Sequence, residues 1–277
     1  MKFINPGTRL YNIDMLIYAA IVPHPPFALP SIGKEHAKLF TTTAEACLKI
    51  AEDIALLSVN SILFITQHGE RYKNAVALAM HDPFAASVME YGDMGLTASY
   101  DPDLKLIDKI QRRLKESGVD KTLTTNETVD GATSVALLLL GESVKKIRIA
   151  LATPPKSDGK SVLRAGEAIR ESIEESSARI AVVCVADLCG GLSPISEYGE
   201  NSEATKCSET IKHHINDCNR AALINAQKKS SKLIRFADLD SLIMFFGIIG
   251  DSRVRPEEYA FEAPLGTGHL TEAFHFI

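Results

Sequence analysis

The sequence has no tryptophan, and aromatic residues make up only 6% of its 277 residues. Its formal net charge is a modest −5. Binding to nucleic acid usually requires a basic face for the phosphates, and aromatic side chains serve as platforms for unpaired bases. The scarcity of both features argues against a nucleic-acid partner.

Long apolar runs are also missing. No uninterrupted stretch approaches the ~20 residues that span a membrane, so we expect no membrane segment. The first fourteen residues, MKFINPGTRLYNID, lack the apolar centre of a secretory signal. We interpret residues 1–14 as an N-terminal extension and residues 15–277 as one domain.

Cysteine is scarce and odd in number. The five cysteines are scattered through the chain, at Cys47, Cys184, Cys189, Cys207 and Cys218. This usage predicts reduced thiols and a cytoplasmic location, and it argues against a disulfide framework.

The chain does contain an alternation of short β-rich runs with longer amphipathic ones. Strands are expected at residues 15–22, 61–67, 75–80, 148–154 and 179–188, with strand and loop mixed from Tyr259 onward. Helices are expected at 33–58, with the threonines as a candidate break, and at 101–118, 135–143, 159–177, about 202–229 and 238–250. Continuous Val/Ile/Ala strands between helices predict an α/β fold, a single domain whose mixed or mainly parallel sheet is flanked by helices.

Two of the expected strands end in the same way, with an apolar run followed by a histidine. His24 lies in the stiff segment PHPP, and His68 follows the run SILFITQ. Sites in open α/β sheets form at the carboxyl ends of strands, so the two imidazoles are expected to converge on one metal ion. In the alternative interpretation, each histidine caps its strand through a backbone carbonyl.

A third ligand is needed, and Glu262 in EYAFEAPLGTGHL is the candidate. Two imidazoles and one carboxylate leave three positions open on one face of an octahedral ion, which suits ferrous iron in oxygenases. Zinc accepts the same ligands. The alternative for Glu262 is an ordinary surface carboxylate.

Three segments together resemble signature segments of the class III extradiol ring-cleavage dioxygenases, of the LigB type and its Memo-like relatives. They are YAAIVPHPPFALPSIGKEH, ILFITQHGE and YAFEAPLGTGHLTEAF. The resemblance spans nearly all of the chain from Met15. It implies a single α/β domain with a non-haem ferrous ion held at the strand ends by His24, His68 and Glu262.

The sequence departs from the family pattern at two places. The family's acid/base histidine matches Gly190 in ADLCGGLSP, and a histidine of its substrate pocket matches Gly131 in VDGATSVALLLL. Glycine cannot exchange a proton. The candidate replacements are Cys189, Asp187, His269 and Tyr198. For Cys189 the alternative is a small buried thiol that fills space.

Two further sets of residues are candidate sites. Cys207, His214 and Cys218 share one helical stripe, which fits either a zinc site or a half-buried amphipathic face. Arg253 and Arg255 are candidates to bind a substrate carboxylate, or are solvated loop charges.

The sequence therefore predicts an iron-dependent extradiol-type dioxygenase that acts on a catechol-like diol and dioxygen, with low or altered activity because of the two glycines. One alternative is a Memo-like binding or regulatory protein with a metal or an empty pocket. A zinc hydrolase with the same ligands is another. The apolar run of residues 242–250 is a candidate homo-oligomer surface or part of the core.

Overall fold

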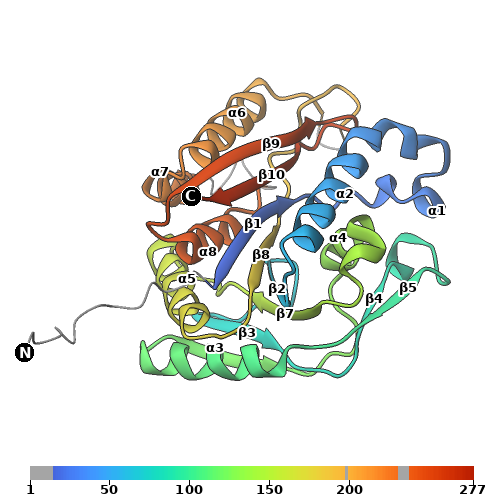
Figure 1. The fold of residues 1–277 in the computed structure, drawn as a ribbon. Coiled ribbons are helices and arrows are strands. Elements are labelled where there is room, and N and C mark those ends of the chain that lie inside the picture. The colour runs from blue at the N-terminus through green and yellow to red at the C-terminus, as the bar shows by residue number, and fades with distance from the viewer. Residues whose placement is uncertain (1–14, 197–198, 230–236) are drawn as a thin grey trace, which may run out of the picture.

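The computed structural model describes residues 15–196, 199–229 and 237–277, and Figure 1 shows their arrangement. The expected extension at 1–14 and the candidate Tyr198 lie outside these described residues. Among the described helices, none is both long and apolar enough to cross a bilayer.

An eight-stranded mixed sheet forms the centre of the molecule. In spatial order its strands are β6 (Asp120–Thr124), β3 (Ala75–Ala79), β7 (Arg148–Thr153), β2 (Ser61–Thr66), β8 (Ile180–Val185), β1 (Leu16–Val22), β10 (His269–Phe276) and β9 (Val254–Glu262). The four central strands, from β7 to β1, run parallel, and β10 is antiparallel to β1. The expected fold, a mainly parallel α/β sheet in one domain, is confirmed.

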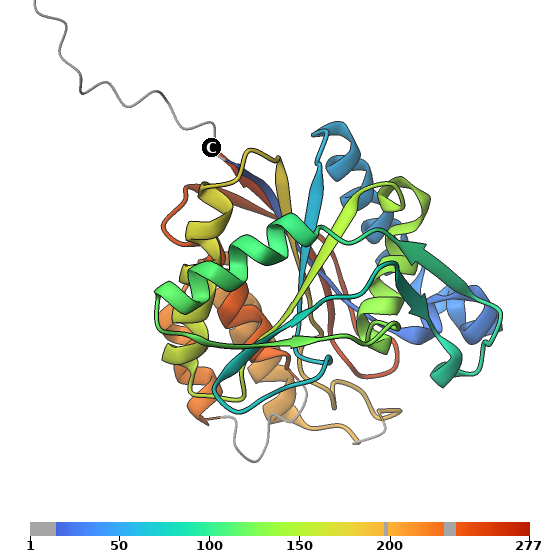
Figure 2. The ribbon, with the colours of Figure 1, turned by 90° about the horizontal axis from the view of Figure 1, so that it is seen from below.

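Helices cover both faces of the sheet, as the view from below in Figure 2 makes clear. One layer contains α3 (Leu104–Glu116), α5 (Gly159–Glu174), α6 (Ser202–Asn216), α7 (Arg220–Lys229) and α8 (Leu239–Ile249). The other layer contains α2 (Thr41–Leu56) and α4 (Gly131–Leu140). Because every residue of the central strands β2 and β8 is buried, their sequences show no polar alternation.

Short elements complete the chain. The helical ones are η1 (Pro26–Ala28), α1 (Pro30–Gly33), η2 (Lys34–Phe40), η3 (Met89–Tyr91) and η4 (Gly141–Val144). The strands β4 (Phe84–Ser87) and β5 (Thr97–Tyr100) pair with each other outside the main sheet. They project beside α4, with η3 in the connection between them.

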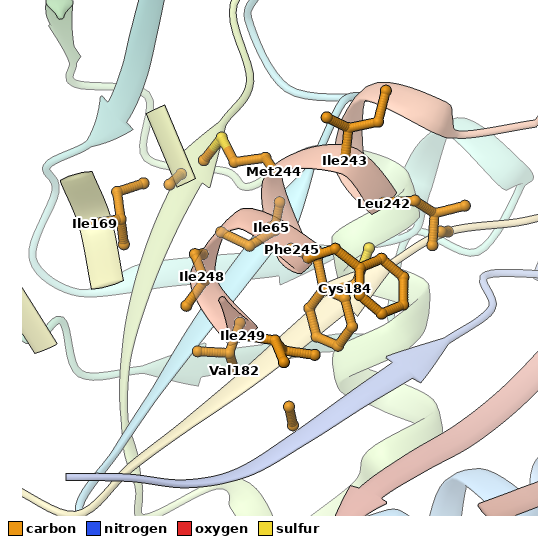
Figure 3. Packing of buried hydrophobic residues seen from close by; sticks show 14 of the residues in the cluster. Ile65, Ile169, Val182, Cys184, Leu242, Ile243, Met244, Phe245, Ile248 and Ile249 are labelled. Carbon is orange, nitrogen blue, oxygen red and sulfur yellow. The ribbon is translucent and has the colours of Figure 1, made fainter. Parts of the chain in front are cut away.

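Helix α8 is almost completely buried, and its large side chains pack on the sheet (Figure 3). A helix that is apolar on all sides belongs in a core, so residues 242–250 are explained without an oligomer interface. Two glycines let α8 and α5 approach closely. A Cβ at Gly166 would lie 2.2 Å from Met244 O, and one at Gly247 would lie 2.5 Å from Leu163 O.

Some expected boundaries were wrong. The helix expected over 202–229 is two helices, and it breaks near Cys218, whose φ is +49°. In contrast, the break that was expected at the threonines of 33–58 is confirmed, because η2 gives way to α2 at Thr41. The strands β4, β5 and β6 were not expected, because each is short and β5 and β6 are only partly buried.

Candidate metal centre

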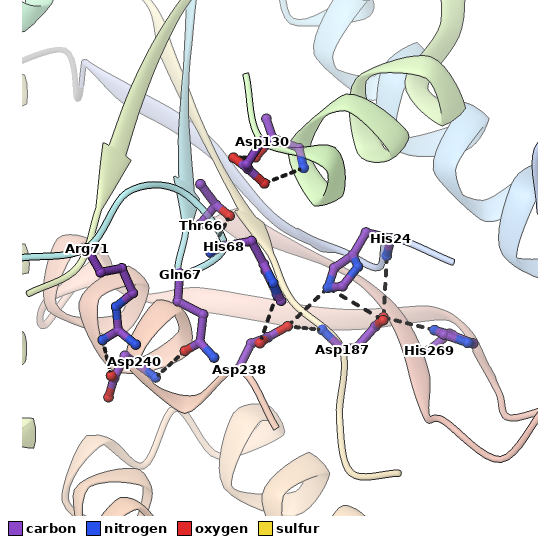
Figure 4. Close-up of polar contacts among 11 residues, drawn as sticks. His24, Thr66, Gln67, His68, Arg71, Asp130, Asp187, Asp238, Asp240 and His269 are labelled. Atoms are coloured by element: carbon purple, nitrogen blue, oxygen red, sulfur yellow. Dashed lines mark hydrogen bonds and ion pairs between the residues drawn. The ribbon is translucent and has the colours of Figure 1, made fainter. Parts of the chain in front are cut away.

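Three functional side chains follow the carboxyl ends of three neighbouring parallel strands. His24 follows β1, His68 follows β2, and Asp187 follows β8, which lies between the other two. Parallel strands end at the same edge of a sheet, so all three side chains meet there, as Figure 4 shows. The strand order explains how residues remote in sequence come together.

The two histidines share one carboxylate, that of Asp238. His68 Nε2 lies 3.0 Å from Asp238 Oδ1, and His24 Nε2 lies 3.2 Å from Asp238 Oδ2. The two imidazole ring centres are 4.5 Å apart. One ligand atom from each of these three residues lies within 4.8 Å of the other two. Two imidazoles and a carboxylate therefore surround one point.

Asp238 is fixed by its position at the start of α8. It is the N-cap residue of that helix, and the side chain is only 4% exposed. The backbone amide of Asp187 donates to Asp238 Oδ2 at 2.8 Å. The third member of the group is thus held by both the helix and the end of β8.

A second carboxylate, Asp187, lies beside the group. Its Oδ2 is 3.5 Å from His24 Nε2, and its Oδ1 accepts the backbone amide of His24 at 3.3 Å. The same Oδ1 lies 2.8 Å from His269 Nδ1. His269 opens β10, is 4% exposed and contacts the ring of Phe40. Two of the four candidate replacements, Asp187 and His269, therefore form a buried Asp–His pair next to His24.

The loop that carries His68 is tied to neighbouring elements. The His68 amide donates to Thr66 Oγ1 at 3.1 Å, and Gln67 Oε1 accepts the amide of Asp240 at 3.2 Å. Arg71 forms an ion pair with the Asp240 carboxylate and donates to the carbonyl of Pro155 at 3.0 Å. These bonds connect the end of β2 directly to the start of α8.

Burial and neighbouring charges shift the pKa values of these groups in opposite directions. Burial lowers the pKa of His24, but Asp187 and Asp238 outweigh burial and raise that pKa to about 9. Burial raises the pKa of both carboxyl groups, yet the histidines hold the pKa of Asp187 and of Asp238 below the usual range. The site thus keeps two buried carboxylates charged, which favours a cation between them.

The structure does not bring Glu262 into this group. Glu262 ends β9, the edge strand, which is separated from β1 by β10. Its Oε1 accepts the amide of Thr43 at 2.9 Å and also the Thr43 hydroxyl, in the first turn of α2. Asp238, and not Glu262, therefore completes the group with His24 and His68. The reason is that β9 lies two strand spacings from β1 and the Glu262 carboxylate binds a helix N-terminus.

Cys189 lies after β8 but does not belong to the group. It is 2% exposed and belongs to the apolar cluster between the sheet and the α8 layer. Cys207, His214 and Cys218 do not gather with a further His, Cys, Asp or Glu into a metal-binding group among the described residues. Arg253 and Arg255 are exposed, and Arg255 pairs with Glu257 on the same strand.

One wall of the site is formed by the start of α4. Asp130 caps that helix by accepting the Thr133 amide at 2.9 Å. A Cβ at Gly69, the residue after His68, would lie 3.8 Å from Asp130 Oδ2. A Cβ at Gly131 would lie 1.5 Å from Glu90 Oε1 and 2.7 Å from the hydroxyl of Tyr91. Side chains from η3 therefore occupy the space that a side chain at 131 would need.

The functional residue that sequence reasoning missed is Asp238. It stands in ADLDSLIMFFGIIG, where a carboxylate directly precedes an apolar helix. That pattern is typical of a helix N-cap, but the side chain here bonds no amide of its own helix. The only feature of the sequence that could have pointed to Asp238 is an aspartate placed directly before an apolar run that forms a buried helix.

The donor set fits a metal ion. Asp and Glu are rarely buried without a partner, and Asp238 is buried against two imidazoles. Each imidazole presents a lone pair to a metal ion in its neutral form, so binding of the ion would displace the His24 proton. Two histidines and one carboxylate suit ferrous iron with open positions, and zinc also accepts them. His24, His68 and Asp238 are the residues that would hold the ion.

Comparison with known proteins gives a family and a relative. The model of the family described as the catalytic LigB subunit of aromatic ring-opening dioxygenase matches residues 18–269. Protein CA_C1420 of Clostridium acetobutylicum is 21% identical over 258 residues. The match covers 90% of this chain and 55% of that relative, so this chain spans about half of its length.

A solved structure shares the fold. The crystal structure of an uncharacterized protein, JW3007, from Escherichia coli K12 superposes with a TM-score of 0.64 at 12% identity. The superposition covers 93% of this chain and 99% of that one.

Proposed function

Because the chain belongs to the family of catalytic LigB subunits of aromatic ring-opening dioxygenases, we propose that it opens the ring of a catechol-like diol with dioxygen. In this proposal a ferrous ion is held by His24, His68 and Asp238. The observation that carries the proposal is the convergence of these three side chains on one point at the sheet edge. The bound ion would supply the redox chemistry that joins the diol and dioxygen.

The chain's own residues would hold the ion and move protons. Asp187 fixes His24 through the His24 amide and ring, so the ligand keeps its orientation. Asp187 Oδ1 also accepts from His269 Nδ1, which leaves His269 Nε2 as an acceptor for a proton from a diol hydroxyl. His269 would thereby do the work that glycine cannot do at position 190.

The α4 wall would orient the diol. Glu90, Tyr91 and Asp130 present oxygen atoms around the start of α4. Burial and the nearby Glu90 carboxylate raise the pKa of Tyr91 to about 12, so its hydroxyl stays protonated and can donate a hydrogen bond. This wall is a candidate for contact with polar substituents of the ring.

The test is anaerobic purification without chelators, followed by metal analysis and by reconstitution with ferrous iron or zinc. Iron-loaded protein should consume dioxygen with a panel of substituted catechols and give ring-opened products in matching amounts, whereas zinc-loaded protein should not. Fully iron-occupied protein that turns over none of the panel would overturn the dioxygenase proposal.

A second candidate is a Memo-like metal-binding protein without ring-opening activity. The specific observation in its favour is that Gly131 and Gly190 carry no side chain, while Glu90 and Tyr91 fill the space beside Gly131. Retention of tightly bound metal together with no turnover would favour this candidate.

A further inference from the structure

Two of the segments that carry the metal-binding group are joined at one residue, Asp240. This residue lies two positions after Asp238, in the first turn of α8. The loop that follows β2 carries His68, with Gln67 before it and Arg71 after it. Gln67 and Arg71 both contact Asp240, as Figure 4 shows. The loop is therefore bonded to the start of α8 on both sides of His68.

Asp240 makes these bonds with its backbone and with its side chain. Its amide donates to Gln67 Oε1 at 3.2 Å. One carboxylate oxygen, Oδ2, forms an ion pair with Arg71, and the other, Oδ1, accepts from Gln227 of α7. The side chains of the ion pair are mostly buried, because Arg71 is 17% exposed and Asp240 is 16% exposed. Solvent ions screen such a pair less than an exposed one.

Arg71 extends the connection to the end of a third strand. Its Nε donates to the carbonyl of Pro154 at 3.3 Å, and its Nη2 donates to the carbonyl of Pro155 at 3.0 Å. These two prolines directly follow β7. One planar guanidinium therefore binds together the ends of β2 and β7 and the start of α8.

Asp240 does not belong to the metal-binding group itself. Within the part of the chain that the structure describes, that group contains only His24, His68 and Asp238. Both oxygens of the Asp240 carboxylate are already bonded to residues outside the group. Asp240 would therefore act on a bound ion through the positions of His68 and Asp238.

We propose that Asp240 and Arg71 are positioning residues that hold His68 and Asp238 at binding distance ahead of the ion. The inference rests on the proposed metal centre, but it does not depend on ring opening. His68 Nε2 lies 3.0 Å from Asp238 Oδ1, and the contacts of Asp240 and Arg71 restrict the movement of both segments. A ligand set that is already assembled loses less conformational freedom on binding, so its affinity is higher.

The test is titration of the metal-free full chain with cobaltous ion, whose visible absorption reports the ligands that surround it. Asp240→Asn keeps the shape of the side chain but loses the charge opposite Arg71 and turns an amide NH2 group toward a donor. We expect the cobalt affinity to fall about 10–100-fold, the usual cost of losing an outer partner of a metal ligand. The metal-free variant should also exchange amide hydrogens faster in peptides that contain residues 67–71.

Asp251→Asn is the matched control. It removes an ion pair with Arg220 just beyond the other end of α8, where the Asp251 side chain is 92% exposed. Its cobalt affinity and its hydrogen exchange at residues 67–71 should equal those of the unmodified chain.

A second variant tests whether the two positioning residues act as one unit. Arg71→Gln should lose affinity by a similar factor, and the double variant Arg71→Gln/Asp240→Asn should lose no more than either single variant. Circular dichroism of the metal-free proteins checks that each variant is folded during the titration.

The outcomes separate this inference from the metal centre. Unchanged affinity in both single variants, or losses that add in the double variant, would overturn the positioning role and leave the metal centre in place. Unfolding of both single variants would assign the ion pair to fold stability and would also overturn that role. An unmodified chain that binds no cobalt would overturn the metal centre, and this inference with it.

Discussion

His24 and Asp238 are 214 positions apart in the chain, and His24 Nε2 lies 3.2 Å from Asp238 Oδ2. One residue follows a central strand and the other begins a buried helix, so the contact joins the sheet to the α8 layer. A bound ion at this contact would be coordinated from both layers at once.

Asp238→Asn should abolish metal binding, because the amide keeps the shape but loses the charge between the two histidines. We expect the affinity to fall by more than the about 10–100-fold that loss of an outer partner costs. Metal content and calorimetric titration measure this change. Glu262→Gln is the matched control and should bind metal normally. If Glu262→Gln lowered the metal affinity more than Asp238→Asn did, Glu262 would be the third ligand.

His269→Gln should retain the metal but lose about 10²–10⁴-fold in kcat for the catechol that the unmodified protein turns over, because the variant lacks the proton acceptor. Metal analysis and steady-state kinetics measure the two effects. A loss of metal in proportion to the loss of turnover would mean that His269 only supports the site structure.

Gly131→Ala should disturb the α4 wall without unfolding the protein. The new Cβ would overlap Glu90 Oε1 and crowd the Tyr91 hydroxyl, so these two side chains of η3 would have to shift. We expect a higher KM with unchanged metal content. Gly95→Ala, in the same connection between β4 and β5 that contains η3, is the control. Its Cβ would come no closer than 3.6 Å to Asp93 Oδ1. Equal KM values for the two variants would show that η3 does not contact the substrate.

Gly247→Ala should destabilise the fold by about 1–3 kcal/mol, because its Cβ would lie against a rigid backbone carbonyl of α5. Since α8 carries Asp238 at its start, metal affinity should fall as well. Chemical denaturation and metal titration test both effects. Glu167→Ala, an exposed position on α5, should change stability by less than about 0.5 kcal/mol.

Glu272 should make the folded state less stable as pH rises. This side chain is fully buried, and no hydrogen-bond partner for its carboxylate oxygens lies within the described residues. Burial, followed by the Glu258 carboxylate, raises its pKa from 4.5 to about 8. The neutral form is therefore favoured in the fold, and this contribution to stability is complete below pH 4.5 and is lost as the pH approaches 8.

Glu272→Gln should remove that pH dependence, which has a slope of at most about 1.4 kcal/mol per pH unit. Denaturation curves between pH 5 and pH 8.5, roughly the window in which linkage acts, measure the slope. Glu209→Gln, an exposed carboxylate on α6, should leave the slope as it is. Parallel curves for the unmodified chain and Glu272→Gln would show that the carboxylate is already ionised in the fold.

The sequence predicted the class of fold, and it predicted that His24 and His68 converge, for a clear physical reason. Buried parallel strands are continuous apolar runs, and the polar residue that follows such a run lies at the functional edge. His24 and His68 both stand at that point. Asp238 does not follow a strand, so its place depends on how α8 packs against the sheet, which no local pattern encodes.

For Glu262 the local structure was predicted correctly, but its position in the sheet was not. Its segment looks like a strand that runs into a turn, which is correct, but the sequence does not reveal that β9 is the outermost strand. The break near Cys218 and the short strands β4 and β5 were missed for a related reason. They depend on local backbone geometry and on pairing partners distant from the expected sheet.

The glycine contact between α5 and α8 has a consequence for protein engineering. Filling tight interiors with larger side chains is a common route to heat resistance, yet at positions 166 and 247 it would tilt the element that presents Asp238. Stabilising designs should therefore begin in the layer of α2, on the far face of the sheet, where added bulk leaves α8 and its Asp238 undisturbed.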